Sequence, residues 1–202
     1  MICNLKKKAF TVIEIVIVIF IIAIIVSMSI PFSLTNIKQA KLISLWQRTL
    51  DEANYAYDVF NLQENSSFDQ LHKFFEANYI SSKSKPNLKN YKIKFLDNSN
   101  ISKNSKYFIK DFYLLENGTI LGYKIDNPYC KGEQICGIMI FDLNGEDQPN
   151  KFGKDVFGVE IYRKTLLPFG HNLSQAALKL DCSRQSSGVY CSEYFLYAGK
   201  LD

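Results

Sequence analysis

The stretch that decides the fold begins Lys6-Lys7-Lys8-Ala9-Phe10-Thr11-Val12-Ile13-Glu14 and continues through residues 15–30 without a single charge. A helix rises about 1.5 Å per residue, so the apolar run from Phe10 to Ile30 would span roughly 30 Å, the thickness of a bilayer core. The basic residues before the run favour a cytoplasmic start and an exported C-terminal part. The run therefore predicts a membrane-spanning helix over residues 10–32.

Two features distinguish this stretch from an ordinary membrane anchor. Glu14 lies inside the apolar run, where an unpaired carboxylate costs about 2.5–3.5 kcal/mol. Ala9 comes before the run, whereas a secretory signal peptide has its small-residue cleavage site after an apolar region of about 7–15 residues. Cutting after Ala9 would keep the apolar run and leave an α-ammonium group on Phe10, four residues from Glu14. In a low dielectric these opposite charges are tolerated only together.

This order of residues resembles the class III leader of type IV pilins and of the pseudopilins of type II secretion systems. The matching positions are the three lysines 6–8, Ala9 at the cut, Phe10 as the new N-terminus and Glu14 as the fifth mature residue, with Ala9 standing where the family usually has Gly. The resemblance implies cleavage after Ala9 by a prepilin peptidase and N-methylation of Phe10. It also implies that Glu14 pairs with the Phe10 ammonium group of a neighbouring subunit in a filament.

The same resemblance implies a structural role and a set of partners. These partners are other pilin or pseudopilin subunits, the prepilin peptidase, the inner-membrane assembly platform and the membrane itself. The expected location is the inner membrane, followed by an extracytoplasmic filament. Two alternatives are a minor or competence pilin whose head binds DNA or a surface, and a membrane-anchored binding or enzymatic domain that forms no filament.

The rest of the chain predicts an α+β fold, a long N-terminal helical spine packed on an antiparallel sheet. Apolar residues at three- and four-residue spacing extend the helix through residues 33–62, with Pro31 as the only breaker. A proline at this position, the 22nd mature residue, is also frequent in the pilin helices that the sequence resembles. Leader residues 1–9 are expected to be removed, and residues 63–202 to form the head.

Within the head, local patterns predict the individual elements. Ser67 and Gln70 form a capping box at the start of a second helix. Alternating β-branched and aromatic residues predict strands over 91–96, 107–115, 119–125, 137–143 and 157–163. Asn117-Gly118 predicts a hairpin turn, because these residues accept a positive φ. A short helix is expected over residues 188–198, before Gly199.

The cysteines provide a second argument for export. Removing the leader discards Cys3 and leaves an even number, Cys130, Cys136, Cys182 and Cys191. An even number in an exported chain indicates disulfides, and the spacings suggest the local pairs Cys130–Cys136 and Cys182–Cys191. Crossed pairings stay open from the sequence. Zinc is an alternative ligand, but the cysteines lack C-x-x-C spacing and the chain has only two histidines.

One loop of the head carries a cluster of acids and amides. Residues 142–155 read DLNGEDQPNKFGKD, directly after a predicted strand. Hard cations such as Ca²⁺ prefer such oxygen-rich loops, and the expected donors are Asp142, Asn144, Asp147 and Asp155. The alternative is a rigid turn in which Asp and Asn side chains bond the local backbone.

The charge distribution and the sequence motifs limit which other functions are plausible. The formal net charge of +4 falls to +1 without the three leader lysines, and residues 81–110 hold eight lysines against one acid, Asp97. Such a basic segment is typical of phosphate binding, and Tyr91, Phe95, Tyr107 and Phe108 would add base stacking. The alternative is a soluble loop whose aromatics belong to the core. The sequence contains no nucleophile elbow, Walker loop, H-E-x-x-H motif or dinucleotide-binding turn, which argues against an enzyme.

Overall fold

The computed structural model describes residues 11–62, 67–79 and 91–198, without the side chains of residues 28–36, 38, 39, 69, 72 and 76. The chain divides into two compact units, Met1–Ala40 and Lys41–Asp202. Helix α1 (Val12–Leu62) contributes residues to both units. The structure does not place the two units relative to each other, so each is described separately.

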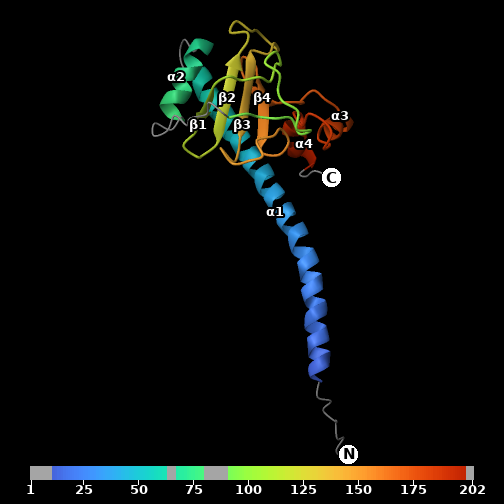
Figure 1. Cartoon of the computed structure of the whole chain (residues 1–202). Coiled ribbons are helices and arrows are strands. Elements are labelled where there is room, and N and C mark those ends of the chain that lie inside the picture. The colour runs from blue at the N-terminus through green and yellow to red at the C-terminus, as the bar shows by residue number, and fades with distance from the viewer. Residues whose placement is uncertain (1–10, 63–66, 80–90, 199–202) are drawn as a thin grey trace, which may run out of the picture. The chain divides into compact units, whose positions relative to one another are not determined.

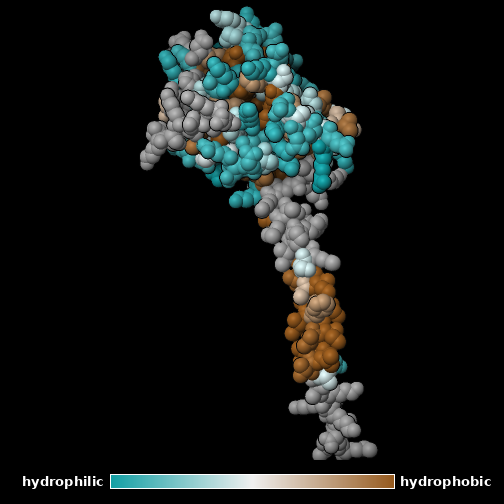
Figure 2. Space-filling view, in the orientation of Figure 1, coloured by the Kyte–Doolittle hydropathy of each residue, from teal (hydrophilic) through white to brown (hydrophobic). Residues whose placement is uncertain are grey.

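The first unit contains the apolar part of α1. The large hydrophobic side chains between Val12 and Val26 are all exposed, by 41% to 79% of their surface. Figure 2 shows them as an almost unbroken apolar band around the helix. Within the described part of the chain, no helix combines the length and the apolar character that crossing a membrane requires. The membrane span over residues 10–32 is therefore not confirmed.

The second unit is an α+β domain, as predicted (Figure 1). Residues 41–62 of α1 are followed by α2 (Phe68–Asn78) and by a five-stranded antiparallel sheet with the strand order β1-β2-β3-β4-β5. The strands are β1 (Phe112–Leu114), β2 (Ile120–Ile125), β3 (Gly137–Asp142), β4 (Val156–Ile161) and β5 (Leu166–Pro168). Two short helices, α3 (Gln175–Asp181) and α4 (Cys191–Ala198), complete the domain.

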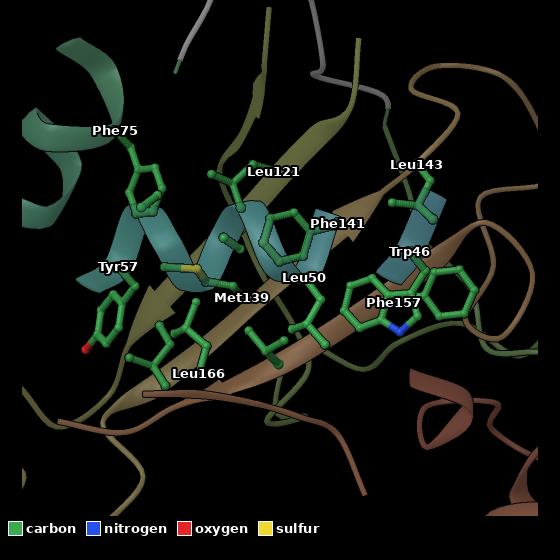
Figure 3. Packing of buried hydrophobic residues seen from close by; sticks show 14 of the residues in the cluster. Trp46, Leu50, Tyr57, Phe75, Leu121, Met139, Phe141, Leu143, Phe157 and Leu166 are labelled. Atoms are coloured by element: carbon green, nitrogen blue, oxygen red, sulfur yellow. The ribbon is translucent and has the colours of Figure 1, made fainter. Parts of the chain in front are cut away.

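One face of the sheet packs on the C-terminal half of α1. Trp46 is fully buried, and its ring stacks on Phe157 of β4 with 5.2 Å between the ring centroids. Figure 3 shows Trp46, Leu50 and Tyr57 of α1 lying with Met139, Phe141 and Phe157 of the central strands. These sheet residues alternate along β3 and β4, so every second side chain enters this core. The apolar face predicted for residues 42–60 is the face that the sheet covers.

The opposite face of the sheet is covered by residues 91–111, which we call the cover segment. Ile93 and Ile109 of this segment form a second core with Ile138 and Ile140 of β3, together with Phe152, Val156, Phe169 and Val189. Antiparallel sheets often leave this face to water. Here both faces are buried, which explains why every residue of β3 is buried.

Several predicted elements differ from the structure. Residues 91–96 contain no strand, only an isolated bridge at Lys94, and 107–115 contain only β1. The apolar and polar residues of these stretches alternate because one side of the cover segment packs on the sheet. The backbone of the segment does not join the hydrogen-bond ladder of the sheet. The predicted capping box is also wrong, because the Ser67 side chain makes no capping hydrogen bond.

The remaining predictions of elements agree with the structure in part. The turn at Asn117-Gly118 is present, with Gly118 at φ +87° and Leu115 N–H bonded to Thr119 O at 2.8 Å. The helix predicted over 188–198 begins at Cys191, and β5 and α3 were not predicted. Disulfides join Cys130 to Cys136 and Cys182 to Cys191, each with a Cα–Cα distance of 5.2 Å. The second disulfide ties the end of α3 to the start of α4.

Candidate assembly segment and a buried acidic loop

The start of α1 is closed by a capping box that the sequence reasoning missed. The Thr11 N–H and the Thr11 hydroxyl both donate to Oε2 of Glu14, each at 2.8 Å. In return, the Glu14 N–H lies 3.4 Å from Oγ1 of Thr11. The signal was present in the sequence, because Thr-Val-Ile-Glu places Thr at the N-cap and Glu at the third helical position.

This arrangement gives Glu14 a local role in addition to the predicted pairing. Both bonds from Thr11 use the same carboxylate oxygen, and Oε1 has no hydrogen-bond partner among the described residues. Oε1 can therefore accept from a donor outside the chain while the capping box stays closed. The side chain is fixed by its own helix and still carries a charge that two neutral donors do not balance.

The other predicted assembly positions have less structural detail. Ala9 and Phe10 lie outside the described residues. The backbone of α1 continues as a helix through Pro31, whose side chain is not described. Their predicted roles in cleavage, methylation and assembly stay predictions, as do the predicted limits of the four segments of the chain.

The loop after β3 is built around two buried aspartates, each only 1% exposed. Asp142 ends β3 on the side of the cover segment, and its Oδ2 accepts a hydrogen bond from the Tyr91 hydroxyl. Its Oδ1 accepts from the Asn144 N–H at 3.2 Å. Asp142 therefore links the cover segment, the sheet and the loop.

Asp155, at the other end of the loop, is held by main-chain groups. Its Oδ2 accepts from the Asn150 N–H at 2.9 Å, and its Oδ1 accepts from the Lys151 N–H at 2.7 Å. These bonds close the turn around Asn150, which has a positive φ of 49°. The sequence alternative of a turn held by acidic side chains thus describes the local backbone well.

Burial of the two aspartates changes their protonation. Burial raises the pKa of Asp142 to about 7, and the hydrogen bond from Tyr91 opposes this rise. The negative charge of Asp155 contributes to the same increase in the pKa of Asp142. Burial also raises the pKa of Asp155, against the hydrogen bonds from Lys151 and Asn150. Two carboxylates that share a dry site disfavour each other's charge.

Three of the four predicted calcium donors are linked by hydrogen bonds in this loop. Asp142, Asn144 and Asp155 meet in this loop, whereas Asp147 is exposed. The described residues contain no group of three or more His, Cys, Asp or Glu side chains arranged to hold a metal ion. A calcium site would therefore need amide or main-chain oxygens in addition to the two aspartates.

The basic segment is only partly described, since Lys83, Lys85 and Lys89 lie outside the described residues. The described lysines of the segment are exposed, at positions 92, 94, 103, 106 and 110. Three of the four aromatics predicted to stack bases, Tyr91, Phe95 and Tyr107, pack on the second core: Phe95 stacks on Phe152, and Tyr107 contacts Phe169 edge to face at 5.2 Å. They do not form an open platform for stacking bases, and DNA contact stays a prediction.

A comparison with known proteins bears on the first of these sites. Residues 4–30 match the family model of the prokaryotic N-terminal methylation motif. No curated protein and no solved structure shows a significant match to the chain. The matched range includes Ala9, Phe10 and Glu14, so the predicted class III signal of type IV pilins and pseudopilins is confirmed. The match covers only this N-terminal segment and leaves the head without a matched relative.

Proposed function

We propose that this protein is a structural subunit of a type IV pilus or of a type II secretion pseudopilus. It enters the inner membrane as a precursor, is cleaved after Ala9, is methylated on Phe10 and assembles through the N-terminal part of α1. The head is exported and has a structural rather than an enzymatic role. The observation that carries this proposal is the methylation motif at residues 4–30.

The exposed apolar residues of α1 support the proposal. The large apolar side chains from Val12 to Val26 are exposed in the described part of the chain. Contiguous apolar surface of this extent marks a membrane or protein contact. A membrane before assembly and neighbouring helices after assembly would bury the same residues in turn. Membrane, assembly platform and other subunits are therefore the partners that this segment requires.

Glu14 supplies the specificity of the assembly step. Its capping box fixes the carboxylate at the start of the helix, and its second oxygen remains for the Phe10 ammonium group of a neighbour. A charged pair in a low-dielectric bundle stabilises one register, because a misplaced subunit leaves both charges unpaired. Thr11 has a positioning role, since it holds the carboxylate that makes the contact.

Two near-isosteric substitutions separate the charge from the cap. Glu14→Gln keeps an oxygen that can accept from Thr11 but removes the negative charge, whereas Thr11→Val keeps the charge and removes the hydroxyl. We expect Glu14→Gln to be cleaved normally and to be lost from filaments. We expect Thr11→Val to retain assembly at a reduced level, because a lost cap costs about 1 kcal/mol. Both are measured by quantifying the protein in sheared filament and membrane fractions.

The reverse result would contradict the ion pair. If Glu14→Gln assembles as well as the wild type while Thr11→Val fails, Glu14 acts only as a helix cap. Processing is followed in the same samples by the loss of the nine-residue leader, so a defect in cleavage is distinguished from a defect in assembly. The alternative of an anchored domain without a filament predicts no sheared fraction for any variant.

A further inference from the structure

The head exposes opposite charges on its two outer sides. Helix α1 and the cover segment bury opposite faces of the sheet, so the outer face of each points away from the other. On the outer face of α1, Asp51, Glu52 and Asp58 are exposed. Arg48 is the only basic residue from 48 to 62, and its Nε lies 2.7 Å from Oε1 of Glu52. Asp51 and Asp58 have no ion-pair partner among the described residues.

The outer face of α1 also carries two large side chains with apolar surface. Residues at spacings of three or four form one line along this face: Asp51, Tyr55, Asp58 and Leu62. Tyr55 is 70% exposed and Leu62 is 83% exposed. Tyrosine is enriched in protein interfaces, and its ring attracts an ammonium group placed over its face. A tyrosine between two carboxylates therefore favours a partner that presents lysines.

The outer side of the cover segment presents such lysines. Ile93 and Ile109 are buried in the second core, whereas the lysines of the segment are exposed. We call this surface the lysine face: Lys92, Lys94, Lys103, Lys106 and Lys110. Of these five, only Lys106 has a carboxylate partner among the described residues, Glu160 at 3.9 Å. The other four lysines are not paired with a described carboxylate.

The two surfaces cannot meet within one chain, because the sheet lies between them. A two-fold dimer buries the same patch of both subunits, so it would not bring opposite sides of the head together. The outer face of α1 can therefore reach a lysine face only on another copy. That contact leaves one surface of each kind free at the two ends of the pair, so further copies can add. Heterologous contacts of this kind build rings or open filaments.

We propose that the outer face of α1 in one head docks on the lysine face of a second copy of this chain. This inference rests on the proposed function and adds a contact between heads to the contact between N-terminal helices. A lysine of one copy lies between Asp51 and Asp58 of the other and covers the ring of Tyr55. Nucleic acid would also attract the lysine face, but it would repel the carboxylates of α1. A second copy accounts for both surfaces at once.

Chemical crosslinking of sheared wild-type filaments provides the test. A zero-length carbodiimide joins a carboxylate to an ammonium group where the two are in contact, and mass spectrometry identifies the linked peptides. We expect amide bonds between chains that join Asp51 or Asp58 to a lysine of residues 92–110. We expect a lower yield when the salt is raised, because the Debye length falls from about 10 Å at ~0.1 M to about 3 Å at ~1 M.

Charge reversal identifies the two surfaces. Asp51→Lys combined with Asp58→Lys places like charges against the lysine face, and we expect roughly tenfold less protein in the sheared fraction. Lys92→Glu combined with Lys94→Glu should cause a similar loss. A chain with all four substitutions has both surfaces reversed, so assembly should recover. All four positions are exposed, and loss of the leader in the same samples shows that each variant is processed.

A matched control reverses exposed acids elsewhere on the head. Glu133→Lys combined with Asp147→Lys should leave assembly unchanged. Wild-type filaments without amide bonds between the two surfaces would overturn the head contact while the proposed function stands. The absence of any sheared filament would overturn both. If reversal of the lysines abolishes DNA retention and leaves assembly intact, the lysine face binds nucleic acid and the proposed docking is wrong.

Discussion

At the scale of single residues, the head is organised by a few buried side chains whose polar atoms have partners. Trp46 donates from Nε1 to the carbonyl oxygen of Ser192 at 2.8 Å, and Tyr57 donates to the carbonyl oxygen of Tyr162 at 2.8 Å. Both side chains are fully buried, so these bonds allow α1 to place large polar aromatics against the sheet. Trp46 is also the only tryptophan, which makes it a fluorescent reporter of head unfolding.

Glu193 is a buried residue with an unsatisfied hydrogen-bond acceptor. It is 6% exposed in the first turn of α4, and its Oε2 has no hydrogen-bond partner among the described residues. Burial raises the pKa of Glu193, and the positive charge of His171 and a hydrogen bond with Tyr197 oppose this increase. The folded head thus holds a proton on Glu193 more tightly than the unfolded chain does.

This difference predicts a pH dependence of stability. A raised pKa in the folded state contributes stability that is complete below the unfolded pKa and is lost as the pH rises through the folded pKa. We therefore expect the Glu193→Gln variant to gain stability over the wild type as the pH increases from 4 to 7. Urea unfolding followed by Trp46 fluorescence measures the difference, with Glu116→Gln as the exposed control. A constant difference across this range would show that Glu193 does not titrate with folding.

At the scale of elements, β4 depends on a close approach that only glycine allows. A Cβ atom on Gly158 would lie 2.1 Å from Cε2 of Phe169, which packs in the second core. The Gly158 N–H donates to Oγ of Ser192 at 2.9 Å, so the strand also has a fixed distance to α4. Gly158 thus sets how closely β4 approaches Phe169 and α4.

Gly158→Ala is therefore expected to destabilise the head by about 1–3 kcal/mol, the usual cost of overpacking a core. Phe169→Leu in the same chain should recover part of that loss, because it removes the ring atoms that the new methyl group meets. A double-mutant cycle from urea unfolding gives the coupling. Strictly additive effects of the two substitutions would contradict the proposed contact.

The elements also show which structural features the local sequence can predict and which it cannot. The hairpin of β1 and β2 was predictable, since its turn residues Asn117-Gly118 and its alternating side chains agree. The cover segment was predicted as strands, because apolar and polar residues alternate along it. This alternation indicates that one side is buried, but it does not reveal whether the backbone forms hydrogen bonds with a sheet. The capping box at Thr11 was readable and was missed, while the one expected at Ser67 does not form. The pairing of Asp142 with Tyr91 joins residues 51 positions apart, which no local pattern could indicate.

At the scale of the whole molecule, the N-terminal motif can be recognised from the sequence alone, whereas the fold of the head cannot. The motif over residues 4–30 depends on a short linear pattern and was predictable in full. The head has no matched relative, so its fold had to come from packing, in which α1 and the cover segment bury opposite faces of one sheet. Within the matched range 4–30, the N-terminal segment carries a pattern shared with the prokaryotic N-terminal methylation motif.

The central claim is that cleavage after Ala9 creates the functional N-terminus. Mass spectrometry of the protein isolated from its native membranes and filaments tests it directly. We expect an N-terminal peptide that begins at N-methylated Phe10 and contains Glu14. A mature protein that still begins at Met1 and retains Lys6, Lys7 and Lys8 would contradict it.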